Sequence, residues 1–149
     1  MVSGRSAAAE PSPDRVSDDL VELLTVTQRR LAAGVSAALA EDGATLDGYR
    51  LLRALAPGGR AMGALVSALQ LPAPTLTRLV DAAVDSGLAY RLPDPDDGRK
   101  VVVHLAEAGR TRLTRLESLV RAHESALAAT LGPERVAALA RALLDLATA

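Results

Sequence analysis

Residues 79–109 read LVDAAVDSGLAYRLPDPDDGRKVVVHLAEAG, and this stretch decides the fold. Apolar residues at helical spacing run as far as Ser86-Gly87, where a helix is expected to end. Residues 88–93 and 101–105 then alternate in side-chain character, which is typical of strands with two different faces. The charged loop between them contains Asp97-Gly98, a common turn signal. The stretch therefore predicts a helix that is followed directly by a β-hairpin.

The rest of the chain carries helical periodicity. Apolar residues recur at intervals of three and four between Thr, Gly and Pro signals, which predicts helices at residues 17–41, 45–57, 62–69, 74–85, 107–131 and 133–149. Ser17 is expected to cap the first helix, and Pro74 to occupy the first position of the fourth. Residues 1–16, rich in Ala, Ser and Pro, are expected to be disordered. The predicted fold class is mainly α with a small β-hairpin.

Composition limits the functional classes. The chain has 149 residues, a net charge of −1 and no cysteine. One domain at residues 17–149 is expected, without disulfides or cysteine-based sensing. No apolar run reaches the ~18–20 residues of a membrane span, and the N-terminus lacks the core of a signal peptide, so a cytoplasmic protein that binds no membrane is expected.

No catalytic or metal-binding pattern is present. We find no nucleophile with a nearby base and no phosphate-binding glycine loop, so no enzyme activity and no cofactor are expected. His104 and His123 are far apart in the sequence, which disfavours a metal site. Asp94, Asp96 and Asp97 lack the spacing of an EF-hand loop. A metal-dependent enzyme built on these aspartates remains an alternative that bound metal in purified protein would reveal.

The hairpin resembles part of a known family. Residues 93–99, PDPDDGR, followed by an apolar strand and Glu107-Ala108-Gly109, resemble the wing of the MarR family of bacterial transcriptional regulators. In element order the resemblance runs from about Ser17 to the C-terminus. It implies a homodimer that binds double-stranded DNA, usually as a repressor, and often responds to a small-molecule effector. It also implies a winged helix-turn-helix lobe at residues 45–106, between dimerisation helices at 17–41 and 107–149.

The helix before the hairpin is then the recognition helix. Because Leu76 and Val80 are expected to face the core, the outward positions include Thr75, Thr77 and Arg78. Arginine can pair with guanine or reach a phosphate, and threonine can contact base edges or the DNA backbone. We expect these three residues to contact DNA.

The resemblance also assigns roles in the wing. It implies that Asp97 holds Arg99 and that Arg99 enters the minor groove, where a narrow A·T-rich groove attracts a guanidinium. Gly98 is expected to give the turn a positive φ. Arg91 and Lys100 are expected to contact phosphates.

Two departures from the family pattern support an alternative function. Ala73 stands where a Ser cap is common, and Gly98 stands where many members carry a basic residue. Residues 72–100 contain four basic and five acidic residues, so the local net charge is also −1. The alternative is a winged-helix dimer with weak or lost DNA binding, acting as a small-molecule-binding or protein-interaction module.

An effector pocket is expected between the dimer helices and the DNA-binding lobe, because the resemblance places ligands there. The nearest residues are Arg30, Tyr49, Leu113, Leu116 and Val120. The Tyr49 hydroxyl would orient a polar ligand among aliphatic side chains. The alternative is that Tyr49, at helical spacing from Leu52, belongs to the core.

Overall fold

The structure is a computed structural model that describes residues 19–149. The tail expected at residues 1–16 and the cap expected at Ser17 lie outside the described residues. The described residues divide into two units, 19–33 and 34–149, and the boundary between them falls inside the first described helix. That helix, α2, spans Leu20–Ala40. In the first unit it exposes the apolar side chains Leu20, Val21, Leu23, Val26 and Leu31.

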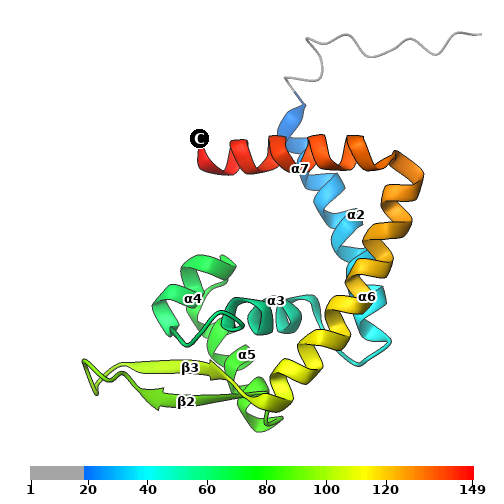
Figure 1. Ribbon diagram of the computed structural model, residues 1–149. Helices are drawn as coiled ribbons and strands as arrows, with labels where there is room; N and C mark the ends of the chain where they lie inside the picture. Colours follow the sequence, from blue (N-terminus) through cyan, green and yellow to red (C-terminus); the bar gives the residue numbers. More distant parts are fainter. Residues whose placement is uncertain (1–18) are drawn as a thin grey trace, which may run out of the picture. The chain divides into compact units, whose positions relative to one another are not determined.

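The second unit contains the end of α2, the other predicted helices and the hairpin (Figure 1). Its elements follow the order α3 (Leu46–Leu55), β1 (Arg60–Ala61), α4 (Met62–Leu69), α5 (Ala73–Asp85), β2 (Ala89–Pro93), β3 (Val101–Leu105), α6 (Glu107–Leu131) and α7 (Pro133–Thr148). The mainly helical fold class is confirmed. None of the helices in residues 19–149 is long and apolar enough to span a membrane.

The sheet has three strands rather than two. The short strand β1 pairs antiparallel with β3, and the strand order is β1-β3-β2. The sequence did not reveal β1 because two residues are too few to show alternation. In the hairpin Ala89 pairs with Leu105, and both are buried. Tyr90 pairs with His104 on the other face, where their rings stack with centroids 5.3 Å apart.

One hydrophobic core holds these elements together. Its fully buried side chains are aliphatic and come from the end of α2 and from α3, α4, α5, β3 and α6, namely Leu39, Leu51, Leu55, Leu65, Leu76, Val80, Val103 and Leu116. Truncation of such a leucine to alanine typically costs ~2–5 kcal/mol of folding stability. This core fixes α5 against α3, α4 and β2, and so positions the surface described next.

The hairpin is anchored at its base by a close backbone approach. Gly109, in the first turn of α6, is buried, and a Cβ atom built there would lie 2.1 Å from the carbonyl oxygen of Leu88. The same carbonyl accepts a hydrogen bond from the backbone amide of Ala106 at 2.9 Å. Glycine at this position therefore allows α6 to begin directly against the first residues of the hairpin.

Candidate nucleic-acid interface

Helix α5, the expected recognition helix, begins one residue earlier than expected. Pro72 is its N-cap, with extended backbone angles, and Ala73 and Pro74 are its first residues. The expectation that Pro74 occupies the first position after an Ala73 cap is therefore wrong. Proline has no amide hydrogen and fits any position of the first turn whose amide lacks a partner. The position of Pro74 therefore could not show whether the helix starts at Ala73 or at Pro74. No side chain caps the helix.

The periodicity of α5 separates a buried face from an exposed one. Leu76, Val80 and Ala83 are buried, while Thr77 and Arg78 are exposed. Thr75 is half-buried. The hydroxyl of Thr77 donates a hydrogen bond to the Ala73 carbonyl oxygen at 3.0 Å. Its oxygen therefore remains free to accept, which suits the amino groups of adenine and cytosine, while its methyl group suits thymine.

An ion pair joins α5 to the wing. A guanidinium nitrogen of Arg91 in β2 donates a hydrogen bond to a carboxylate oxygen of Asp81 in α5. Both side chains are partly exposed, at 34% and 52%. Arg91, expected to be a phosphate contact, thus already has an acidic partner on the recognition helix.

The tip of the wing is organised by two aspartates. Asp94 Oδ1 accepts the backbone amides of Asp96 at 2.8 Å and Asp97 at 3.4 Å. Asp97 Oδ1 in turn accepts the backbone amide of Arg99 at 3.1 Å. Backbone hydrogen bonds from Asp94 to Lys100 and from Lys100 to Asp97, at 2.8 and 2.9 Å, close the loop. Among the described residues Asp97 therefore holds the main chain of Arg99, and no ion pair joins it to the guanidinium.

The glycine of this loop does not have the expected conformation. The positive-φ glycines of residues 19–149 are Gly43, Gly58, Gly87 and Gly132, so the positive φ expected at Gly98 is wrong. The side-chain and backbone bonds of Asp94 and Asp97 close the turn without it. A Cβ atom built on Gly98 would meet no other atom within 4 Å. The position therefore has room for a side chain.

Three cations remain on this surface. Arg78 on α5 and Arg99 and Lys100 on the wing are exposed, and none of the three pairs with an acidic group within residues 19–149. Such side chains can neutralise phosphates or enter a groove. The wing and α5, joined by the Arg91–Asp81 ion pair, thus both carry exposed cations.

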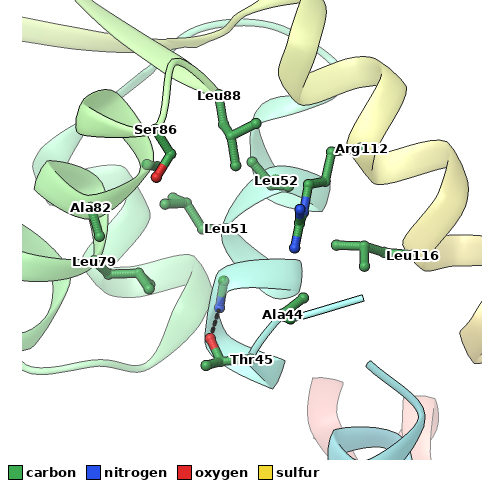
Figure 2. A pocket seen from close by; sticks show the side chains of 13 residues that line it. Ala44, Thr45, Leu51, Leu52, Leu79, Ala82, Ser86, Leu88, Arg112 and Leu116 are labelled. Atoms are coloured by element: carbon green, nitrogen blue, oxygen red, sulfur yellow. Dashed lines mark hydrogen bonds between the residues drawn. The ribbon is translucent and has the colours of Figure 1, made fainter. Parts of the chain in front are cut away.

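A separate cavity of about 400 Å³ lies among α3, α5, α6 and the loop at residues 43–45 (Figure 2). Of the five residues expected to form an effector pocket, only Leu116 lines it. Tyr49, Leu113 and Val120 are buried in the core. The Arg53 guanidinium lies 5.6 Å from the centre of the Tyr49 ring. Arg30 is exposed on α2 in the first unit.

Comparisons with known proteins agree with this geometry. A model of the MarR family matches residues 45–100. A structure of the transcriptional repressor CouR bound to a 23-mer DNA duplex is 27% identical, covers 93% of this chain and 99% of that chain, and has a TM-score of 0.82. These matches support the MarR family that the wing motif indicated.

Two further MarR-family structures share the fold. A mutant MarR from E. coli complexed with operator DNA has 22% identity, covers 91% of this chain and 99% of that chain, and has a TM-score of 0.78. CouR from Rhodococcus jostii bound to p-coumaroyl-CoA has 23% identity, covers 89% of this chain and 94% of that chain, and has a TM-score of 0.76. A comparison with curated proteins gives no match. MarR-family proteins are DNA-binding transcriptional regulators, and the matched homologues are regulators rather than enzymes.

Sequence reasoning missed three residues, one each in the wing, in α5 and in the cavity wall. Asp94 was considered only as part of an acidic cluster, although an aspartate before Pro95 is a recognised turn former whose side chain accepts nearby amides. Helical spacing places Asp81 on the outward face of α5, but nothing in the spacing shows that it meets Arg91. Arg112 lines the cavity, and no local signal distinguishes it from the other arginines of α6.

The two histidines have structural surroundings. His104 packs against Tyr90 and against Gly59, where a Cβ atom would lie 2.3 Å from its ring. His123 of α6 lies beside Gly34 of α2, where a Cβ atom would lie 2.7 Å from its ring. Within residues 19–149 no group of three or more His, Cys, Asp or Glu side chains is placed to hold a metal ion.

Proposed function

We propose that this chain is a sequence-specific transcriptional repressor that binds a pseudo-palindromic operator as a homodimer and responds to a small molecule. The observation that carries the proposal is the shared surface of α5 and the wing, where Thr77 and Arg78 lie on the helix and Arg99 lies at the wing tip. The 27% identity to a repressor bound to DNA supports it. Because such a regulator acts on the chromosome, we expect it in the bacterial cytoplasm.

Direct readout would fall on few side chains. Arg78 is suited to a guanine edge or a phosphate, and Thr75 and Thr77 to base edges or the DNA backbone. Arg99 would enter the minor groove while Asp97 orders its backbone. Lys100 would contact a phosphate. Arg91 would contribute less than a free arginine, because Asp81 already neutralises it.

The apolar surface of the terminal helices supports a homodimer. No residue of α7 is buried, and its Leu139, Leu143, Leu144 and Leu146 are 42–67% exposed. The first part of α2 exposes a second apolar group, from Leu20 to Leu31. Apolar surface of this kind is commonly covered by a second copy in a symmetric dimer. A two-fold dimer would place its recognition helices about 34 Å apart on successive major grooves.

Small-molecule control is supported by CouR, one of whose structures contains p-coumaroyl-CoA. An effector can release DNA only by binding the DNA-free form more tightly than the DNA-bound form. We propose this regulation without an enzymatic step and without a cofactor.

The test begins with selection of DNA sites from a random duplex library by the full chain. Fluorescence anisotropy on the selected duplex then measures affinity across a series of salt concentrations. Arg78→Ala and Arg99→Ala should each weaken binding by about 1–3 kcal/mol if they reach bases, and should lower the salt slope if they reach phosphates. Arg121→Ala is the matched control, because Arg121 is an exposed arginine about 21 Å along α6 from its first residue.

A selected palindromic sequence, with loss of affinity in Arg78→Ala and Arg99→Ala but not in Arg121→Ala, would support the repressor. If no sequence is enriched, or binding is independent of salt and of Arg99, the chain has instead lost DNA recognition. That result would favour the winged-helix dimer that binds small molecules or proteins, a function that the near-zero charge of residues 72–100 also fits.

A further inference from the structure

The cavity among α3, α5 and α6 has walls that are almost entirely aliphatic. Leu51 and Leu52 come from α3, Leu79 and Ala82 from α5, and Leu116 from α6 (Figure 2). Its volume of about 400 Å³ lies in the range of small-molecule sites. Within residues 19–149, no aromatic side chain lines it. The walls therefore suit a flexible aliphatic group better than a flat ring that needs stacking.

Among the described residues one charged side chain, that of Arg112, lines this apolar cavity. Arg112 extends from α6 beside Leu116 and Leu52 toward Ala44 (Figure 2). Its Nη2 donates a hydrogen bond to the carbonyl oxygen of Asp42, and its Nε lies 3.7 Å from Asp42 Oδ2. No acceptor for its Nη1 is found within residues 19–149. A guanidinium has five N–H donors and can donate two hydrogen bonds to one carboxylate, so Arg112 retains donors for a second acid.

The carboxylate of Asp42 is poorly satisfied. Its Oδ2 is buried and accepts no hydrogen bond within residues 19–149. It lies 3.7 Å from Arg112 Nε and 3.6 Å from Arg115 Nη2, so its contacts with both arginines are longer than hydrogen bonds. Asp42 can therefore transfer its electrostatic pairing to Arg115 if another anion takes Arg112.

We propose that this cavity binds an aliphatic monocarboxylate, with the carboxylate on Arg112 in competition with Asp42 and the alkyl chain among the leucines. The proposal rests on the proposed function for its regulatory consequence. Leu79, Ala82 and Ser86 of the cavity wall belong to α5, next in sequence to Arg78 and Asp81 on the exposed face. A ligand that fills the space between α3 and α5 acts directly on the recognition helix of the same protomer.

Calorimetry on the full chain without DNA tests the site. Octanoate is the probe, and octanol and octylamine are controls of the same chain length without a negative charge. Octanoate should bind, and Arg112→Gln should weaken it about tenfold or more, the effect of losing one charge-assisted contact. Arg115→Gln is the matched control, because Arg115 also pairs with Asp42 but does not line the cavity, and should change affinity less than about threefold.

Two further variants separate the ligand contact from a general loss of structure. Asp42→Asn removes the competing carboxylate and should tighten octanoate binding several-fold. Ala82→Met places a longer side chain in the cavity and should abolish octanoate binding, while the unfolding temperature stays near that of the parent chain. Equal binding of octanoate and octanol, no effect of Arg112→Gln, or weaker binding in Asp42→Asn would overturn the proposal.

The regulatory step is measured separately. Octanoate should lower the affinity of the parent chain for its selected duplex but not that of Ala82→Met. If octanoate binds and DNA affinity is unchanged, the cavity is a ligand site without control of DNA, and the regulatory part is wrong. If the chain binds no DNA, the proposed function fails while calorimetry still decides whether the cavity takes the acid.

Discussion

Asp81 of α5 and Arg91 of β2 form an ion pair across ten residues of sequence. Its partly exposed position limits its direct contribution to folding stability to ~1 kcal/mol or less. In the proposed DNA complex its effect is larger, because Asp81 neutralises Arg91 and places a carboxylate near Arg78. The pair explains how a surface with four basic residues can present only three free cations.

We therefore expect Asp81→Asn to strengthen DNA binding. The change frees Arg91 for a phosphate and removes a negative charge that repels the DNA backbone. Affinity should rise several-fold at low salt, and the salt slope should increase by about one phosphate contact. Fluorescence anisotropy at four or more salt concentrations measures both quantities.

Asp85→Asn is the control for this prediction. Asp85 is also exposed on α5 and carries the same charge, but no basic side chain pairs with it within residues 19–149. Its change should affect affinity less than Asp81→Asn. A loss of affinity in Asp81→Asn would mean that the ion pair is needed to position the wing, and would contradict the prediction.

Gly98 offers a second way to strengthen DNA binding. Its φ is not positive, and no atom lies within 4 Å of a Cβ atom built there, so Gly98→Arg should fold without strain. The new cation, next to Arg99 on the exposed loop, should raise affinity several-fold and steepen the salt dependence. Gly98→Ala should leave DNA binding unchanged and keep or slightly raise the unfolding temperature, since alanine restricts the unfolded chain. A clear fall in that temperature in Gly98→Ala would show that the glycine is required by the turn.

A side chain at Gly109, unlike one at Gly98, should destabilise the fold. A Cβ atom at this position would lie 2.1 Å from the Leu88 carbonyl oxygen and 2.6 Å from Leu105 Cδ1, so backbone atoms must move. Gly109→Ala should lower the free energy of unfolding by about 1–3 kcal/mol, as overpacking of a core typically does. Urea denaturation followed by circular dichroism measures the change. Gly63→Ala, in α4 with nothing within 4 Å of its Cβ, should be neutral or slightly stabilising, and equal effects in the two variants would refute the argument.

The predicted features that match the structure are those with local causes. The faces of α5 follow from helical periodicity, which places Leu76 and Val80 on the core side and Thr77 and Arg78 outside. The hairpin follows from alternation and from a turn-rich loop. The hairpin motif is a continuous stretch of sequence, so it could be recognised without the structure. The comparisons support the MarR family that it indicated.

The features that were missed depend on distances between elements. The conformation of Gly98 depends on bonds from Asp94 and Asp97 that close the loop. The cavity is space left between three packed helices, and a list of apolar positions does not show where packing is incomplete. Helical spacing also left two positions open for Tyr49, in a pocket or in the core. The packing of α3 decides between them, because it leaves Tyr49 only 5% exposed.

Asp97 and Arg99 allow a test of how the wing is ordered. Asp97 accepts the Arg99 amide at 3.1 Å, so its contribution to DNA binding should come from ordering the main chain rather than from pairing with the guanidinium. Asp97→Asn keeps a side-chain oxygen for that amide and removes a negative charge, so its DNA affinity should equal or exceed that of the parent chain. Asp97→Ala removes the acceptor and should weaken binding, though less than Arg99→Ala does.

A double-mutant cycle then shows whether the two residues act together. If Asp97 acts through Arg99, adding Asp97→Ala to Arg99→Ala should cost no further affinity, because the positioned side chain is already absent. Anisotropy on one duplex at one salt concentration measures all four proteins of the cycle. Additive losses would show that Asp97 supports the loop independently of Arg99. An Asp97→Asn variant as weak as Asp97→Ala would show instead that the carboxylate charge itself is required, and that the guanidinium pairs with it when DNA is bound.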